Sequence, residues 1–245
     1  MKVYKLYNNT VDLFFDEENH KYFVNELPVD GTTGILSVIN KPALLGWAVK
    51  VTVEFLANVL KPGVALDEVQ IKALLEGAKR AHRQKKTDAA DIGTFVHDWI
   101  KDYIAGKKPA PPVNEQIKNA VDTFLSWEKD QKVEFLESER AIYSKQYGYA
   151  GTLDFIAKIG GKTVLGDFKT SSGIWDEYFL QIAAYQQAYL EEFPDKTIVG
   201  GVIVRIGKDG TLETKETTKY DKDVLGFNGA LVLYRRLQEL KNEKR

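Results

Sequence analysis

Two stretches of sequence decide how this chain folds: YAGTLDFIA at residues 149–157 and VLGDFKTS at residues 164–171. Each is an apolar run of the kind that forms a buried strand, and each is interrupted by a carboxylate, Asp154 in the first and Asp167 in the second. Between them stands Gly160-Gly161, a dipeptide typical of the tight turn of a β-hairpin. The sequence therefore predicts that the two stretches pair as neighbouring antiparallel strands.

The two carboxylates of this hairpin need a partner. A carboxylate on a mostly buried strand is unfavourable when it stands alone, and side chains on adjacent strands can face each other. Asp154 and Asp167 would then repel, unless a divalent cation lies between them. Lys169 follows Asp167 by two residues, so strand alternation puts it on the same face. We therefore expect a cation site with an ammonium group beside it.

Such a site suits phosphodiester hydrolysis. A divalent metal polarises the phosphate and lowers the pKa of bound water from about 15.7 towards neutrality. Lys169 could orient or deprotonate that water and offset developing negative charge. The alternative is an Asp–Lys ion pair at a strand end with Asp154 beside a turn, which the D-x-K triplet alone would favour. The additional Asp154 on the paired strand favours the functional interpretation.

A family resemblance rests on three segments: Gly151-Thr-Leu-Asp154, Asp167-Phe-Lys169-Thr and Gln181-Ile-Ala-Ala-Tyr185. Together they resemble the PD-(D/E)XK signature of RecB-type and phage exonucleases, over residues 91–206. The resemblance implies a mixed α/β (α+β) fold with a restriction-endonuclease-like αβββαβ core and a mainly helical N-terminal region. It also implies a divalent-metal-dependent deoxyribonuclease. Many relatives have Glu where this chain has Asp167, which leaves a shorter reach to the metal.

The resemblance also implies roles for individual residues. Asp154, Asp167 and the backbone carbonyl of Phe168 would ligate Mg²⁺ or Mn²⁺, and Lys169 would act on the attacking water. Gln181 and Tyr185, four residues apart and so on one helix face, would complete the catalytic set and contact the phosphate or the DNA end. Taken without the strand motif, these two residues would instead be interpreted as a core tyrosine and a surface glutamine.

Two further candidate metal ligands lie upstream. Gly93-Thr-Phe-Val-His97 resembles a G-x-x-x-H segment whose histidine is a ligand, and an imidazole would favour Mn²⁺ over Mg²⁺. A histidine beside an apolar helix face is more often structural. Relatives also place a metal-binding glutamate on the first strand, where Glu139 fits best and Glu137 is not excluded. We expect both glutamates to point to one face; the alternative is a solvated strand edge.

A basic run precedes the His97 helix and could line a channel that grips backbone phosphates. The alternative is an ordinary solvated helix face, which is what most charge runs are. Trp47 and Trp175 are candidates for base stacking, although tryptophan is more often a core residue. The candidate phosphate contacts are Lys79, Arg80, Arg83, Lys85 and Lys86.

Residues 106–112, with three prolines, form the clearest break in the pattern. We expect an N-terminal region over residues 1–110 and the nuclease core over residues 111–245, together forming one compact domain. The first part should contain a hairpin within residues 11–30, a capped turn at 35–39 and helices at 44–60, 66–86 and 88–105. The second should run α-β-β-β-α-β-β-α, with helices from 113, at 175–192 and after a capping Asp221, and strands at 133–143, 150–159, 162–169, 197–206 and 212–218.

Composition narrows the class further. The 245 residues include no cysteine, which excludes disulfides, thiolate zinc sites and iron–sulfur clusters, and with them the iron–sulfur relatives of these nucleases. Any metal must be held by oxygen and imidazole, as suits Mg²⁺ or Mn²⁺. A net charge of −1 counts mildly against non-specific DNA coating and leaves room for a local basic groove. No apolar stretch approaches the roughly 20 residues of a bilayer span, so we expect a cytoplasmic protein without membrane contact.

These observations favour a DNA exonuclease of phage or prophage type, used in recombination or repair on linear duplex or single-stranded DNA. A structure-specific or restriction-like endonuclease is the first alternative, since the same core serves both. A nucleic-acid-binding module that has lost the chemistry is the second, and the intact set of Asp154, Asp167 and Lys169 argues against it. Cleavage polarity, homo-oligomer formation and a recombination partner stay open.

Overall fold

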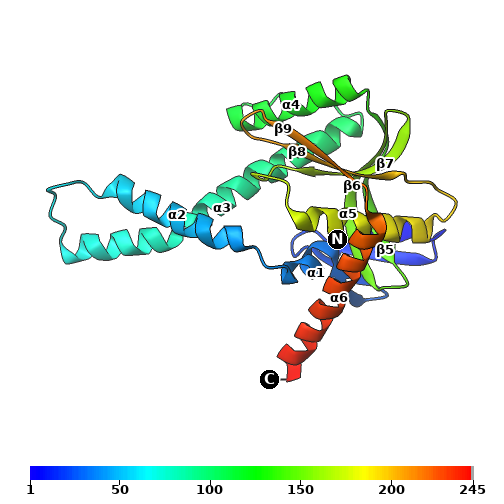
Figure 1. Cartoon of the computed structure of the whole chain (residues 1–245), viewed down its shortest axis with the longest axis horizontal. Coiled ribbons are helices and arrows are strands. Elements are labelled where there is room, and N and C mark those ends of the chain that lie inside the picture. Colours follow the sequence, from blue (N-terminus) through cyan, green and yellow to red (C-terminus); the bar gives the residue numbers. More distant parts are fainter. Residues whose placement is uncertain (244–245) are drawn as a thin grey trace. The chain divides into compact units, whose positions relative to one another are not determined.

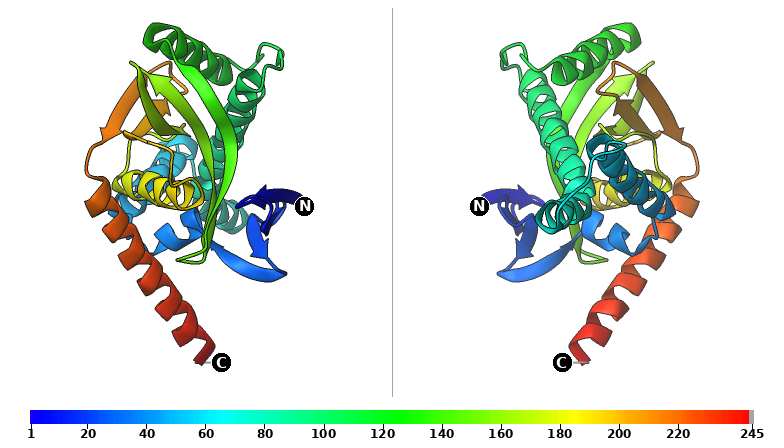
Figure 2. Two further views of the ribbon diagram at one scale, coloured as in Figure 1. Left: turned by 90° about the vertical axis from the view of Figure 1, so that its right-hand side faces the viewer. Right: turned by 90° about the vertical axis from the view of Figure 1, so that its left-hand side faces the viewer.

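In the computed structural model, which describes residues 1–243, the chain is a mixed α and β structure with two compact units (Figure 1). The first unit comprises residues 1–39 and the described residues from Val96 onward. It carries the whole described sheet, with helices around it (Figure 2). The second unit is Asn40–Phe95 and is helical. The break at residues 106–112 falls within the first unit.

The described strands form one mixed sheet in the order β1-β2-β3-β4-β6-β7-β8-β9, with β5 paired to β6. Neighbours are antiparallel except β4 with β6 and β7 with β8, which are parallel. The strands are β1 Lys2–Leu6, β2 Val11–Asp16, β3 Lys21–Val24, β4 Leu27–Gly31, β5 Glu134–Ser144, β6 Tyr149–Ile159, β7 Lys162–Lys169, β8 Gly200–Ile206 and β9 Leu212–Thr217.

The predicted hairpin is present as β6 and β7. Gly160 and Gly161 have φ of 56° and 78°, which a two-residue turn of this kind requires and which glycine adopts without strain. The pairing runs from Ile159↔Lys162 to Phe155↔Gly166. The turn thus fixes the register of the strands that carry Asp154 and Asp167.

Helices cover both faces of this hairpin. Phe124 and Trp127 of α4 make ring contacts with Phe168 of β7, at 5.6 and 6.0 Å between centroids. On the other face, Leu165 joins a core cluster that includes residues of α5 and α6. The helices of the first unit are α1 Thr32–Ile35, the 3₁₀ turn η1 Leu36–Val38, the end of α3, α4 Glu115–Gln131, α5 Asp176–Glu192 and α6 Tyr220–Glu243.

The order α4-β5-β6-β7-α5-β8-β9-α6 confirms the predicted order of elements after residue 113. The last helix begins at Tyr220, so Asp221 lies in its first turn, and the prediction that Asp221 precedes and caps the helix is wrong. The acidic side chain there still interacts favourably with the helix N-terminus.

The N-terminal region is mainly helical, as predicted, but it contains more strands than predicted. The expected hairpin is present as β2 and β3, but β1 and β4 extend it to a four-stranded meander. Leu6, Leu13 and Tyr22 of the meander share a small core with Ala141 of β5 and Ala150 of β6. The meander therefore packs directly against the strands that hold the acidic residues.

The second unit contains α2 (Pro42–Val59) and most of α3 (Glu68–Ile104). The two helices predicted at 66–86 and 88–105 are one continuous helix, because no proline or C-terminal glycine separates them and Ala89-Ala90 favour helix. By length and composition α2 could cross a membrane, which corrects the expectation that no stretch approaches this length. Core helices of soluble proteins pass the same test but are mostly buried, whereas only 6% of α2 is buried in this structure.

The close pairing of β6 with β7 gives a first prediction. A Cβ on Gly166 would lie 1.8 Å from Cζ of Phe155, a fully buried ring. We expect Gly166→Ala to lower the free energy of unfolding by about 1–3 kcal/mol or more, because the ring has no space to move. Urea denaturation measures this. Gly34→Ala is the control, since nothing lies within 4 Å of its Cβ position; an equal loss there would contradict the assigned cause.

Candidate active site

Asp154 and Asp167 lie where the pairing of β6 and β7 ends. Continued beyond Phe155↔Gly166, the register places the two aspartates opposite each other. Since the ladder stops there, the backbone N–H of Phe168 is available, and it donates a hydrogen bond of 2.6 Å to Oδ2 of Asp154. The side chains are only 16% and 4% exposed. The fold therefore holds two carboxylates together with little solvent, as the sequence predicts.

Lys169 lies beside Asp167, as strand alternation predicts. Its Nζ is 2.5 Å from Oδ2 of Asp167 and donates a 3.1 Å hydrogen bond to Oε1 of Gln181. The ammonium also lies 4.7 Å from the centre of the Tyr178 ring. The lysine thus has one carboxylate, one amide oxygen and one aromatic face around it.

Gln181 and Tyr185 continue this chain of contacts along α5. Nε2 of Gln181 donates a 2.6 Å hydrogen bond to the hydroxyl of Tyr185, and both side chains are buried. The Tyr185 ring packs against Gly151, where an added Cβ would meet Cε1 of the ring at 2.7 Å. Gly151 therefore leaves the space in which the tyrosine lies. Both helix residues face the acidic group, and Gln181 is not the surface residue of the alternative interpretation.

The electrostatics follow from burial. Burial, and then the negative charge of Asp167, raise the pKa of Asp154 well above its usual value, against the opposing influence of Lys169. Burial alone would lower the pKa of Lys169, but Asp167 and Asp154 outweigh it and the net change is upward. The lysine consequently stays protonated at neutral pH. Its single positive charge does not neutralise both carboxylates.

His97 reaches the same place from the last turns of α3. Its Nδ1 lies 3.7 Å from Oδ2 of Asp154, and its side chain is 33% exposed. Burial lowers the pKa of the imidazole, while the charge of Asp167 and the backbone of Phe168 act in the opposite direction. The neutral imidazole that results is the form that binds metals. The four predicted ligand groups, including the Phe168 backbone, are thus neighbours.

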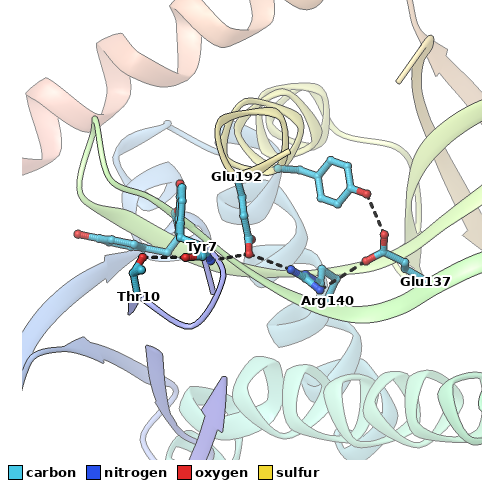
Figure 3. A network of polar contacts seen from close by, with 7 residues as sticks. Tyr7, Thr10, Glu137, Arg140 and Glu192 are labelled. Atoms are coloured by element: carbon cyan, nitrogen blue, oxygen red, sulfur yellow. Dashed lines mark hydrogen bonds and ion pairs between the residues drawn. The ribbon is translucent and has the colours of Figure 1, made fainter. Parts of the chain in front are cut away.

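Glu137 and Glu139 point in different directions, so the expectation that they share a face is wrong. Glu139 has φ of 51°, which interrupts the alternation of β5. Its Oε2 lies 3.6 Å from Nζ of Lys101 on α3, and burial raises its pKa. Glu137 instead accepts a 2.8 Å hydrogen bond from Tyr189 of α5 (Figure 3). Glu137 is therefore held by α5, and Glu139 lies beside Lys101 of α3.

The donor atoms fit a hard divalent cation, because carboxylate and carbonyl oxygens and one imidazole nitrogen meet at this corner. Oδ2 of Asp167 is also buried without a hydrogen-bond partner; Lys169 offers it charge but no aligned donor. Within residues 1–243, no three His, Cys, Asp or Glu side chains are already arranged around one ion position. The side chains would therefore have to rearrange to surround an ion.

The basic run belongs to the second unit, whereas the acidic pair belongs to the first. Lys85 is paired with Glu54 of α2 at 3.0 Å, and Lys79 with Glu76 at 2.7 Å. These pairs reduce the charge that the two lysines offer to phosphate. Three other predicted phosphate contacts are exposed: Arg80, Arg83 and Lys86.

The two tryptophans proposed for base stacking are both partly exposed. Trp47 is 37% exposed in the second unit, and Trp175, 40% exposed, directly precedes α5. Sequence reasoning missed Tyr178, which lies beside Lys169, and Thr32, which lies beside Gly151. The hydroxyl of Thr32 donates a 3.0 Å hydrogen bond to the carbonyl of Ala150. The spacing of Tyr178 from Gln181, three residues on one helix, could have revealed the tyrosine.

Comparisons with known proteins assign no family. No family model matches the chain, and no curated protein matches it. Among solved structures, the crystal structure of SSO0001 aligns with 78% of this chain and 86% of its own, at 16% sequence identity and a TM-score of 0.32. Likeness at this level indicates neither fold nor function.

The repulsion between the aspartates gives a second prediction. We expect Asp154→Asn to raise the free energy of unfolding by about 0.5–2 kcal/mol in the presence of a chelator, the usual range for a single stabilising change. The amide oxygen can still accept the Phe168 hydrogen bond, while one buried like charge is removed. Chemical denaturation with EDTA measures this. Asp12→Asn, on a more exposed strand carboxylate paired with Lys5, is the control. A loss of stability in Asp154→Asn would contradict the electrostatic account.

Proposed function

We propose that this chain is a divalent-metal-dependent deoxyribonuclease of the PD-(D/E)XK type, which acts as an exonuclease on DNA. The observation that carries the proposal is the meeting of Asp154, Asp167 and Lys169 in one buried corner, with His97 and Gln181 in contact with the same group. The sequential elements α4-β5-β6-β7-α5-β8, with β8 parallel to β7, support a nuclease core of αβββαβ order.

Asp154, Asp167, the carbonyl of Phe168 and His97 would hold Mg²⁺ or Mn²⁺. When bound, such an ion polarises the scissile phosphate and lowers the pKa of a coordinated water. The phosphate must approach a corner that is acidic, and charge neutralisation there removes the repulsion between substrate and protein. The carboxylates would therefore admit the anionic substrate only when a cation is bound to them.

Lys169 supplies the positive charge of this chain at the reacting phosphorus. It is held by Gln181, whose amide is in turn fixed by Tyr185. If Asp167 turned towards a cation, the hydrogen bond from Gln181 would still hold the ammonium in place. Lys169 would then orient the attacking water and stabilise the negative charge that develops on the phosphate oxygens. Gln181 and Tyr185 would act by orienting the ammonium group of Lys169.

The biological setting comes from the resemblance alone. Phage or prophage recombination or repair, with linear DNA as substrate, is the role that the motif set favours. Arg80, Arg83 and Lys86 are the cations of the second unit that we propose for phosphate contact, since they are exposed on α3. Such contacts would weaken with added salt.

The test of this function uses two DNA substrates. End-labelled linear DNA and covalently closed circular DNA are incubated with the protein in Mn²⁺, Mg²⁺ or EDTA. We expect degradation of the linear DNA alone, and none in EDTA. Nicking of the circle would replace the exonuclease by an endonuclease of the same chemistry. Tight binding of DNA without cleavage in any metal would contradict the proposed enzyme.

Replacement of the lysine gives a third prediction. We expect Lys169→Ala to fold and to cleave at least about 100-fold more slowly than the wild type, because a group that acts on the water contributes on this scale. Initial rates on the labelled DNA measure the loss. Lys158→Ala is the matched control, since Lys158 lies on β6 in an exposed pair with Glu134. Wild-type rates in Lys169→Ala would refute its role.

A further inference from the structure

Three groups surround the largely buried ammonium of Lys169. An ammonium has three N–H donors and no acceptor, and a buried donor without a partner is unfavourable. Nζ of Lys169 lies 2.5 Å from Oδ2 of Asp167 and donates a 3.1 Å hydrogen bond to Oε1 of Gln181. The third group is the ring of Tyr178, whose centre lies 4.7 Å from Nζ. The ammonium thus has one charged partner and two neutral ones.

The contact with Tyr178 is a cation–π interaction. The face of an aromatic ring carries partial negative charge and attracts a cation that lies within about 6 Å of its centre. Nζ lies over this face. The attraction is larger where water is excluded, and the Lys169 side chain is only 17% exposed. The ring face of Tyr178 therefore stabilises the charged lysine.

The hydroxyl of Tyr178 plays no part in this contact. Among residues 1–243 it has no hydrogen-bond partner, and the backbone N–H of Tyr178 donates to the carbonyl of Trp175. The ring itself packs against the core cluster beside β7. The part of the side chain that meets Lys169 is thus the ring, which phenylalanine would also supply.

Both neutral partners of Lys169 are held by one helix. Tyr178 precedes Gln181 by three residues on α5, so the two side chains lie on the same helix face. Tyr178 packs against the cluster that contains Ile182 and Tyr185. The amide of Gln181 donates a 2.6 Å hydrogen bond to the hydroxyl of Tyr185. Neither partner can follow Lys169 if the lysine moves, so both hold it at a defined place.

A bound cation would affect the charged and the neutral partners differently. In the proposed function, Asp167 binds a divalent cation, and the positive charge of that cation repels the nearby ammonium. The same charge offsets the attraction of Asp167 for Lys169. Gln181 and Tyr178 carry no charge and are not among the proposed metal ligands, so their attraction for the ammonium persists. Lys169 must keep its place to act on the attacking water.

Core packing is the alternative explanation for Tyr178, and its neighbour Phe179 allows the two to be separated. Both side chains are aromatic, half-buried and packed against the same core cluster. Only Tyr178 of this pair has a cation over its ring in the described part of the chain. If packing alone mattered, equivalent changes at the two positions would have equivalent effects.

We infer that Tyr178 is a positioning residue, whose ring face holds the Lys169 ammonium in place when a divalent cation is bound at Asp167. The inference rests on the proposed function, because Lys169 acts on water only in that reaction. It predicts that the negative charge on the ring face of residue 178 determines the cleavage rate, whereas its hydroxyl does not.

The experiment compares rates of Mn²⁺-dependent cleavage of end-labelled linear DNA. Tyr178→Leu keeps an apolar side chain and removes the ring, and we expect cleavage about tenfold slower, as the loss of a desolvated cation–π contact implies. Tyr178→Phe should restore most of that rate. Pentafluorophenylalanine at this position keeps the shape of the ring but removes the negative charge from its face, so it should be as slow as leucine. A merely structural role would not respond to the fluorines.

A second measurement does not depend on catalysis. Urea denaturation in EDTA compares phenylalanine with pentafluorophenylalanine at position 178, once with Lys169 present and once in Lys169→Met. We expect fluorination to lower the urea midpoint only where Lys169 is present, because only then does the ring face a cation. The same decrease in Lys169→Met would show that the ring and the ammonium do not interact, and would overturn the inference.

Phe179→Leu is the matched control and should cleave DNA at the wild-type rate. Equal slowing in Phe179→Leu and Tyr178→Leu would assign the effect to packing. Wild-type rates with pentafluorophenylalanine, or no recovery in Tyr178→Phe, would exclude the ring face as its cause. Each of these results would overturn the inference while leaving the nuclease intact. A wild-type chain that cleaves no DNA in Mn²⁺ would overturn the proposed function itself.

Discussion

Two carboxylates that repel each other are held side by side by the β6–β7 hairpin, and the arrangement of the rest of the first unit follows from this constraint. The hairpin turn at Gly160-Gly161 fixes the register, and the packing of Phe155 over Gly166 brings the strands together just before the acids. Beyond that pair the ladder ends, which frees the Phe168 N–H to bind Asp154. The N–H of Phe168 thus offsets the negative charge of Asp154, and Lys169 offsets that of Asp167.

The surrounding elements each contribute one contact to this corner. From α5, Gln181 and Tyr185 hold the lysine, and from α3, His97 approaches Asp154. The meander secures β5 indirectly, through Tyr7 and Glu192. A site assembled from well-packed strands and helices keeps its groups in place at low mobility, which suits a reaction that depends on the placement of charge.

Much of this arrangement can be predicted from local sequence. The hairpin, the lysine beside Asp167 and the helix that carries Gln181 follow from strand alternation, turn glycines and helical spacing, and the structure has them at nearly the predicted bounds. The two missed strands, β1 and β4, are short, and Pro28 within β4 argues against a strand in isolation. β4 also pairs with β6, a strand far along the chain.

Glu139 shows where local reasoning ends. Strand alternation predicts that Glu139 lies on the same face of the sheet as Glu137. The prediction fails because both Glu137 and Arg140 form hydrogen bonds with α5, which a regular strand does not allow. A left-handed backbone at a glutamate within a strand has no signal in the sequence. The single long α3 is a simpler case: its two halves are predicted as separate helices at 66–86 and 88–105, and no proline or glycine lies between them to end the first.

The central proposal is that Asp154 and Asp167 share a bound divalent cation, which stabilises the folded chain further. Thermal unfolding of the wild type and of Asp167→Asn, each with and without Mn²⁺, tests this most directly. Binding at about 100 times the dissociation constant adds about 2.7 kcal/mol, so the unfolding midpoint of the wild type should rise by roughly 5–10 °C, and that of Asp167→Asn should change little. An equal rise in both proteins, or none in the wild type, would contradict the claim.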